Sequence, residues 1–187
     1  SVTVTDTSTP VNYNFTATST ATCGVDEGTG GTDSGWQASA SYSDTGLQTN
    51  KCYSYEIAAK DNLDNVTATS TASSTYTAAA VPGAPTLDGA TVSTLDLTNA
   101  ENGNPASNPT TDFVVFINGT SPADATWQDR YVDGSGDPST SPVWLSDATL
   151  DALTLQGLNE LTQYDAIVVA RNEDGDLTAS SSAGQGT

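Results

Sequence analysis

Hydrophobic and polar side chains alternate along several short segments of this chain. The clearest run is Tyr53–Ile57, in which Tyr53, Tyr55 and Ile57 are separated by polar residues. Shorter runs of the same kind begin at Val2 and at Tyr13. A period of two places alternate side chains on one face of an extended segment, so these runs predict β-strands with one face in a core.

The second half of the chain continues this pattern and offers no convincing helix. The segment from Leu150 to Leu161 is rich in leucine, but Leu153 and Leu155 alternate and Gly157 interrupts the run, so a short helix is the less favoured alternative there. Tight turns are expected at Asn102-Gly103, Asp133-Gly134 and Asp174-Gly175, since these dipeptides accept positive φ. Strands are expected near 91–98, 111–118, 126–132, 151–156, 163–171 and 177–182.

An internal repeat divides the chain. Gly46-Leu47 followed by Tyr53 recurs as Gly157-Leu158 followed by Tyr164, a shift of 111 positions. The register continues without gaps: 53–60 matches 164–171, and 66–70 matches 177–181. We therefore predict two copies of one module, over residues 1–80 and 82–187, joined by a short Ala-Ala-Val-Pro linker.

The composition of the chain disfavours several classes of function. The 187 residues include 31 Thr, 21 Ser and 16 Gly, as expected for strands and turns, and 4 basic against 23 acidic residues give a net charge of −19. Such a charge disfavours nucleic acid and anionic lipid as partners. The absence of His removes Ser-His and Cys-His dyads and imidazole metal sites, so we expect no enzyme. Membrane insertion is not expected, because the longest apolar block, Phe113–Ile117, is far below the ~20 residues that a span needs.

The repeated segment resembles the fibronectin type III module. Leu, five residues and Tyr are followed by an alternating strand that ends in Ala-Lys-Asp or Ala-Arg-Asn, then by a turn and a Ser/Thr-rich last strand. The first copy is also similar to tandem modules of secreted bacterial surface proteins, in 34–37, 41–47 and 50–53. The resemblance implies an all-β chain of two tandem immunoglobulin-like β-sandwiches, with Tyr53 and Tyr164 as tyrosine corners whose hydroxyls bond to backbone.

Against that pattern, the first copy lacks its first strand. Val11–Thr20 corresponds to the third strand and Ser1–Thr7 to the second, whereas the second copy has its full set from Pro82 onward. An incomplete sandwich leaves apolar core and backbone groups open at one edge. Either the missing strand lies upstream in a longer polypeptide, or another subunit donates it.

The resemblance also brings the only two cysteines together. It places Cys23 just after the third strand and Cys52 at the start of the sixth, and these strands are antiparallel neighbours in the sandwich. A disulfide is therefore expected, and with it an oxidising, extracellular or cell-surface compartment. The alternative is a pair of unbonded small apolar residues.

Three modification sites and several acidic turns are candidate sites of a different kind. Asn14, Asn65 and Asn118 each begin an Asn-x-Ser/Thr sequon, with Asn14 on the outward phase of its strand and the other two at strand ends beside turns. No metal site is assigned, but calcium is a candidate cofactor because oxygen ligands cluster in turns. The simpler interpretation is that these side chains satisfy turn backbone. The acidic clusters are Asp61 with Asp64, Asp133 with Asp137, and Glu173, Asp174 with Asp176.

These observations favour an extracellular structural or adhesive protein. We expect a rod segment, or a subunit of a surface fibre or layer that self-assembles through strand donation, whose partners are copies of itself or neighbouring modules. The alternative is an accessory carbohydrate-binding or spacer module of a secreted enzyme. In that case exposed residues among Trp36, Trp127 and Trp144 would contact polysaccharide.

Overall fold

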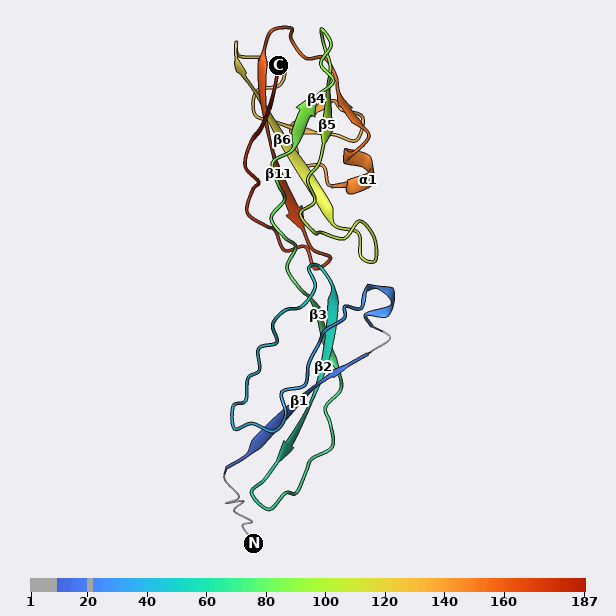
Figure 1. Ribbon diagram of the computed structural model, residues 1–187, viewed down its shortest axis with the longest axis vertical. Coiled ribbons are helices and arrows are strands. Elements are labelled where there is room, and N and C mark those ends of the chain that lie inside the picture. The colour runs from blue at the N-terminus through green and yellow to red at the C-terminus, as the bar shows by residue number, and fades with distance from the viewer. Residues whose placement is uncertain (1–9, 20–21) are drawn as a thin grey trace. The chain divides into compact units, whose positions relative to one another are not determined.

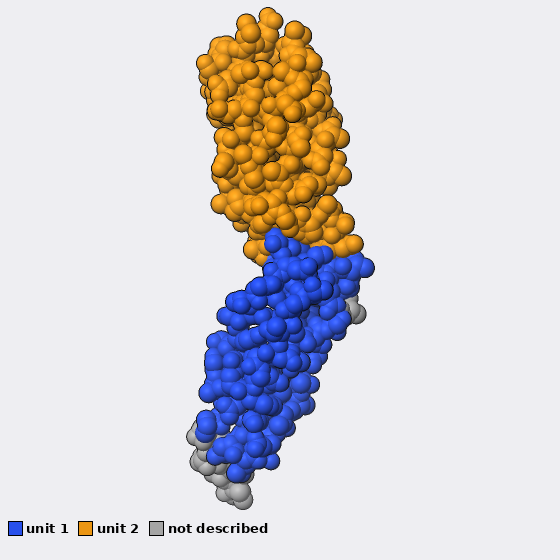
Figure 2. Space-filling model, in the orientation of Figure 1, with its two compact units in different colours: residues 1–77 blue, residues 78–187 orange. Residues whose placement is uncertain are grey.

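The computed structural model describes residues 10–19 and 22–187, and it is all-β apart from two short helical turns. The turns are the 3-10 turn η1 (Gly24–Asp26) and the α-helix α1 (Asp147–Leu150). The chain divides into two compact units, Ser1–Thr77 and Ala78–Thr187, coloured blue and orange in Figure 2. This division lies slightly before the predicted linker.

Unit 1 contains one three-stranded antiparallel sheet over its described residues. The strands are β1 (Asn12–Thr18), β2 (Cys52–Lys60) and β3 (Ser73–Tyr76), in the order β1-β2-β3. The alternating segments that begin at Tyr13 and Tyr53 are thus neighbouring strands. The strand expected over Ser1–Thr7 lies outside the described residues.

Unit 2 is a two-sheet immunoglobulin-like sandwich (Figure 1). One sheet has the order β10-β5-β4, and the other has the order β12-β11-β6-β7-β8 with β9 paired to β6. The strands are β4 (Thr86–Asp88), β5 (Leu95–Thr98), β6 (Asp112–Ser121), β7 (Arg130–Val132), β8 (Pro138–Ser139), β9 (Leu145–Ser146), β10 (Leu153–Leu155), β11 (Gln163–Arg171) and β12 (Gly184–Gly186).

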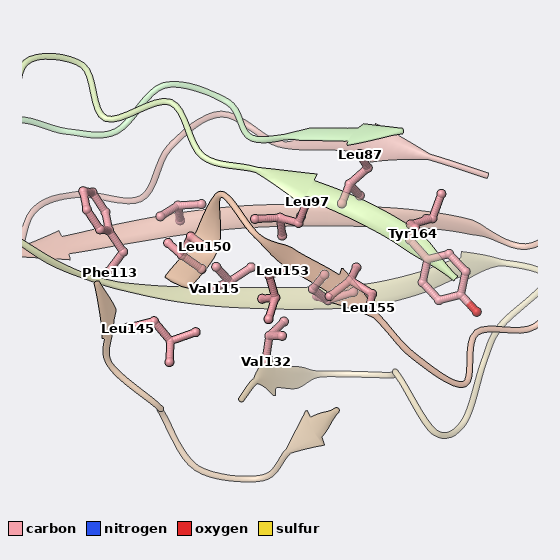
Figure 3. Packing of buried hydrophobic residues seen from close by; sticks show 14 of the residues in the cluster. Leu87, Leu97, Phe113, Val115, Val132, Leu145, Leu150, Leu153, Leu155 and Tyr164 are labelled. Atoms are coloured by element: carbon pink, nitrogen blue, oxygen red, sulfur yellow. The ribbon is translucent and has the colours of Figure 1, made fainter. Parts of the chain in front are cut away.

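The core of unit 2 lies between these two sheets (Figure 3). Leucines at alternate positions of β4, β5 and β10 face a row of small and β-branched side chains on β6 and β11, of which Val115, Ile117 and Val168 are fully buried. Leu150 of α1 and Trp127 are also fully buried. The period-two pattern therefore has the expected consequence in β4, β5, β10 and β11, where buried residues alternate with more exposed ones.

Two local expectations for unit 2 are wrong. The segment 177–182 forms only a bridge from Arg171 to Leu177 and scattered backbone bonds, and the last strand is β12. One helical turn, α1, precedes Leu153, where no helix was expected. The reason is tertiary, because the turn inserts Leu150 into the core, and a four-residue segment carries no periodicity that would reveal it.

The repeat is visible in the hydrogen bonds of the two units. In unit 1 the Ser70 amide donates to the Ile57 carbonyl, and the Ile57 amide donates to the Ser70 hydroxyl; Ser181 and Val168 make the same two bonds in unit 2. Each partner is shifted by 111 positions. The equivalent strands of the two units thus share their detailed pairing and not only their sequence pattern.

The predicted linker belongs to unit 2. The side chain of Asn104 accepts a hydrogen bond from the Ala80 amide at 2.8 Å and donates one to the Ala80 carbonyl at 2.8 Å. The Gly83 amide donates to the Ala100 carbonyl. Ala80 and Gly83 are therefore hydrogen-bonded within unit 2.

Candidate functional site: an open aromatic face on unit 1

One face of the unit 1 sheet carries the aromatic residues that a sandwich would bury. The register pairs Phe15 with Ile57 and Ala17 with Tyr55, so these side chains share one face with Tyr53. In unit 2 the equivalent face of β11 is covered by the sheet β10-β5-β4. Over the described part of unit 1 no second sheet covers it.

An irregular segment lies over part of this face. The ring of Tyr42 packs 5.8 Å from Phe15 and 6.3 Å from Tyr55, measured between ring centroids. The Tyr55 hydroxyl donates to Asp44 at 2.5 Å, and the Thr32 amide donates to the same carboxylate at 2.6 Å. Sequence reasoning missed Tyr42 and Asp44, because they lie outside any strand and carry no periodic signal.

Beside this segment the face opens into a hollow of about 350 Å³. Its walls are largely apolar and include residues of β3, and Ile57 remains 39% exposed although it lies at a core position. Exposure of an aliphatic side chain on a core face is unfavourable in water. The hollow is lined by Phe15, Tyr42, Asp44, Leu47, Tyr53, Tyr55, Ile57, Ser73, Ser74, Thr75 and Thr77.

The rim of the hollow holds a fixed negative charge. Burial raises the pKa of Tyr55, and the Asp44 carboxylate raises it further. Burial opposes ionisation of Asp44, but hydrogen bonds from Tyr55 and Thr32 outweigh it and lower the pKa of Asp44. At neutral pH the Tyr55 hydroxyl is therefore protonated and donates to an ionised Asp44 carboxylate.

The two predicted tyrosine corners have different acceptors. The Tyr53 hydroxyl accepts from the Gln48 amide at 2.9 Å and donates to the Thr29 carbonyl at 2.8 Å. The Tyr164 hydroxyl accepts from the Asn159 amide at 2.8 Å. It donates to the carboxylate of Asp124 at 2.6 Å, whereas Tyr53 donates to a backbone carbonyl.

Cys23 and Cys52 form a disulfide with a Cα–Cα distance of 5.4 Å, and both are buried. Cys52 begins β2, and Cys23 lies in the turn before η1. The bond therefore attaches the segment after β1 to the central strand of the sheet.

The three sequons lie in different environments. Asn65 is exposed in the turn after β2, and its side-chain amide donates to Asp61 at 2.7 Å. Asn14 is half-buried on the face opposite Phe15, with its amide oxygen buried. Asn118 was expected at a strand end, but β6 continues to Ser121, so it lies within the strand and is half-buried. Of the three sequons, Asn65 is the exposed one, and exposure favours glycosylation.

Two of the three acidic turns use a carboxylate to accept hydrogen bonds from their own backbone. Asp61 accepts from the Leu63 and Asn65 amides, and Asp133 accepts from the Ser135 and Asp137 amides, at 2.8–3.0 Å. These contacts are the turn-capping role that the sequence offered as the simpler interpretation.

The three tryptophans lie in different environments. Trp127 is fully buried, and its indole N–H donates to the Gln156 carbonyl. Trp36 has the Lys60 ammonium 5.0 Å from its ring centroid, and Trp144 has the Arg171 guanidinium 4.4 Å from its own. One ring face of each partly exposed tryptophan is therefore occupied by a cation.

No protein-family model matches the chain, and no curated protein sequence matches it. Among solved structures, it is similar to a two-domain fibronectin type III segment of chicken tenascin, with 13% identity, a TM-score of 0.47, and coverage of 94% of this chain and 82% of that one. Chicken CNTN1 domains FN1–FN3 give 12% identity, a TM-score of 0.37, and coverage of 94% and 52%. Titin domains A168–A170 give 12% identity and a TM-score of 0.38, with coverage of 96% of this chain and 53% of that one. Over the described residues no helix is long and apolar enough to cross a membrane.

Proposed function

We propose that this protein is an extracellular structural or adhesive module, a rod segment or self-assembling subunit of a surface fibre or layer, and that unit 1 accepts a β-strand from a second copy of the chain. The observation that carries the proposal is the open aromatic face of unit 1. It is a core face without a covering sheet over the described residues.

Unit 2 indicates what an incoming strand must supply. There the corresponding face of β11 is covered by alternating leucines, such as Leu95 and Leu97 of β5, both almost fully buried. A strand with an apolar residue at every second position could place those side chains in the hollow of unit 1 in the same manner. β3 ends the described sheet on that side and contributes part of the wall.

The extracellular setting rests on the disulfide. Bonds of this kind persist in oxidising compartments and are rare in the reducing cytosol. Cys23 and Cys52 are buried and bonded, which suits a module that stays folded outside the cell.

The test compares the full chain with the variant Ile57→Lys by multi-angle light scattering over a range of concentrations. We expect the unchanged chain to form larger species, and Ile57→Lys to stay monomeric because it places a charge in the hollow. Val92→Lys is the matched control, since Val92 is a 73% exposed aliphatic residue of unit 2.

Assembly of Val92→Lys should equal that of the unchanged chain. A chain that stays monomeric at every concentration would contradict strand donation between copies. So would an Ile57→Lys variant that assembles as well as the control.

A further inference from the structure

Three carboxylates from two separate segments of unit 2 converge at one place. Glu101 follows β5, while Asp147 and Asp151 lie at the two ends of α1. One oxygen of each lies within 4.8 Å of the others. Glu101 precedes Asp147 by 46 positions, so no local motif in the sequence brings them together.

This convergence is electrostatically unfavourable on its own. Asp147 is only 6% exposed, while Glu101 is half-buried and Asp151 is exposed. The side-chain ion pairs of the described residues, Lys60–Asp64 and Arg171–Asp112, both lie elsewhere. Like charges at this separation, one of them buried, repel one another, and a positive charge between them would relieve the repulsion.

A second observation points to a ligand. Asn99 is 8% exposed, and its amide nitrogen donates to the Asp147 carboxylate at 3.2 Å. Its amide oxygen is buried and has no hydrogen-bond partner. Because oxygen and nitrogen share one carbon, this unused acceptor lies near the Asp147 carboxylate. A buried carbonyl oxygen without a donor is costly, and coordination to a cation would satisfy it.

We propose that Glu101, Asp147, Asp151 and Asn99 bind a calcium ion. Carboxylate and amide oxygens are the ligands that this hard cation prefers, at about 2.3–2.6 Å. Oxygens around one such ion are separated by no more than about 5 Å, twice that bond length. The 4.8 Å limit on the separations of the three carboxylate oxygens agrees with a common centre, and water would complete the coordination.

The site would fasten α1 to the loop after β5. The loop leaves β5 and α1 leads into β10, the neighbouring strand of the same sheet, and the disulfide lies in the other unit. A bound ion would therefore stabilise unit 2 without altering the open face of unit 1. This inference does not depend on the proposed assembly.

The experiment titrates Ca²⁺ into the EDTA-treated full chain by isothermal titration calorimetry and records thermal unfolding with EDTA, Ca²⁺ or Mg²⁺. We expect one saturable Ca²⁺ site and a rise of several degrees in the unfolding temperature of unit 2 with Ca²⁺. Mg²⁺ should produce a much smaller rise, because it dehydrates reluctantly and demands octahedral geometry.

The variant Glu101→Gln should shift the unfolding temperature in different directions without and with Ca²⁺. In EDTA it should unfold at the same temperature as the unchanged chain or higher, because one repulsive charge is gone. In Ca²⁺ it should unfold at a lower temperature, with Ca²⁺ affinity reduced at least tenfold. Glu160→Gln removes one exposed charge elsewhere in unit 2 and should behave as the unchanged chain in both conditions.

Three results would overturn the site. They are the absence of saturable binding at millimolar Ca²⁺, an equal response to Mg²⁺, or an equal loss of affinity in Glu160→Gln. The last result would show that Ca²⁺ associates with the overall charge of −19.

Discussion

At the scale of single residues, the two tyrosine corners differ in the group that accepts a hydrogen bond from the tyrosine hydroxyl. Tyr53 donates to a backbone carbonyl, whereas Tyr164 donates to the carboxylate of Asp124, which is 1% exposed. Asp124 also accepts from the Thr126 amide at 2.9 Å. Hydrogen bonds to a charged acceptor are stronger than those to a neutral one, so the second corner should contribute more to stability.

Removal of each hydroxyl tests this difference. Tyr164→Phe should lower the free energy of unfolding of unit 2 by about 2–3 kcal/mol, because a buried carboxylate loses its donor. Tyr53→Phe should cost unit 1 only about 1 kcal/mol. Urea unfolding followed by circular dichroism would measure both values, and equal losses would contradict the special role of Asp124.

The same pair predicts the pH dependence of unit 2. Burial by itself would raise the pKa of Asp124, but the bonds from Tyr164, Thr126 and neighbouring amides lower it overall. A lowered folded-state pKa means that the unfolded chain binds more protons in acid. The stabilisation is therefore present above the ordinary Asp value of about 3.9 and is lost as pH falls through the folded-state value.

Alkaline pH should act in the opposite direction through Tyr164. Burial and the Asp124 carboxylate raise its pKa to about 12. Its contribution is complete below the ordinary tyrosine value of about 10 and disappears as pH rises through 12. In urea unfolding from pH 2 to 12, Tyr164→Phe should reduce the loss of unfolding free energy both in acid and in alkali. A variant with the same pH dependence as the unchanged chain would contradict this assignment.

At the scale of elements, unit 1 depends on a covalent bond where unit 2 depends on packing. The disulfide closes a loop with a sequence separation of 29 in a unit with one described sheet. Loop entropy for this length corresponds to about 3–4 kcal/mol. Cys23→Ala with Cys52→Ala should lower the stability of unit 1 by about that amount in calorimetry and leave the transition of unit 2 in place.

Reduction of the unchanged chain with dithiothreitol is the control for the double variant. It should lower the unfolding temperature of unit 1 to a similar value without any substitution. A double variant as stable as the oxidised chain would show that the open sheet does not need the bond.

Turn glycines provide a matched pair in unit 2. Gly136 has φ +84°, and a Cβ atom there would lie 2.0 Å from the Thr154 carbonyl oxygen, whereas Gly157 has φ +66° and open space around it. Gly157→Ala should cost about 1–2 kcal/mol from backbone strain alone. Gly136→Ala should cost considerably more in urea unfolding, and equal costs would show that the backbone yields easily at Thr154.

At the scale of the whole molecule, the net charge of −19 opposes association between copies. The proposed contact is apolar, so salt should promote assembly by screening the repulsion. The Debye length falls from about 30 Å at 0.01 M to about 8 Å at 0.15 M ionic strength. Light scattering should show more assembly as the NaCl concentration increases. The assembly of Ile57→Lys should increase less with NaCl. Dissociation by salt would instead indicate ion pairs between copies.

The sequence was most informative where chemistry is local. The alternation from Tyr53 to Ile57 predicted β2, and the repeat located β11 over 163–171 because its Tyr-containing strand follows the same turn. The helix α1 and the fastening of Ala80 by Asn104 were not predicted. Both depend on contacts between segments that are distant in sequence, and no periodicity encodes them.

The sequence by itself determined an all-β chain and its repeat, because alternation, turn residues and spacing are local properties. The pairing of the two cysteines and the corner tyrosines were expected from the resemblance to fibronectin type III modules. Only the tertiary structure decided that the core face of unit 1 has no covering sheet over its described residues, that Asp124 accepts from Tyr164, and that Glu101 meets Asp147 and Asp151. These features arise when separate segments pack together, and only folded coordinates specify the distances between them.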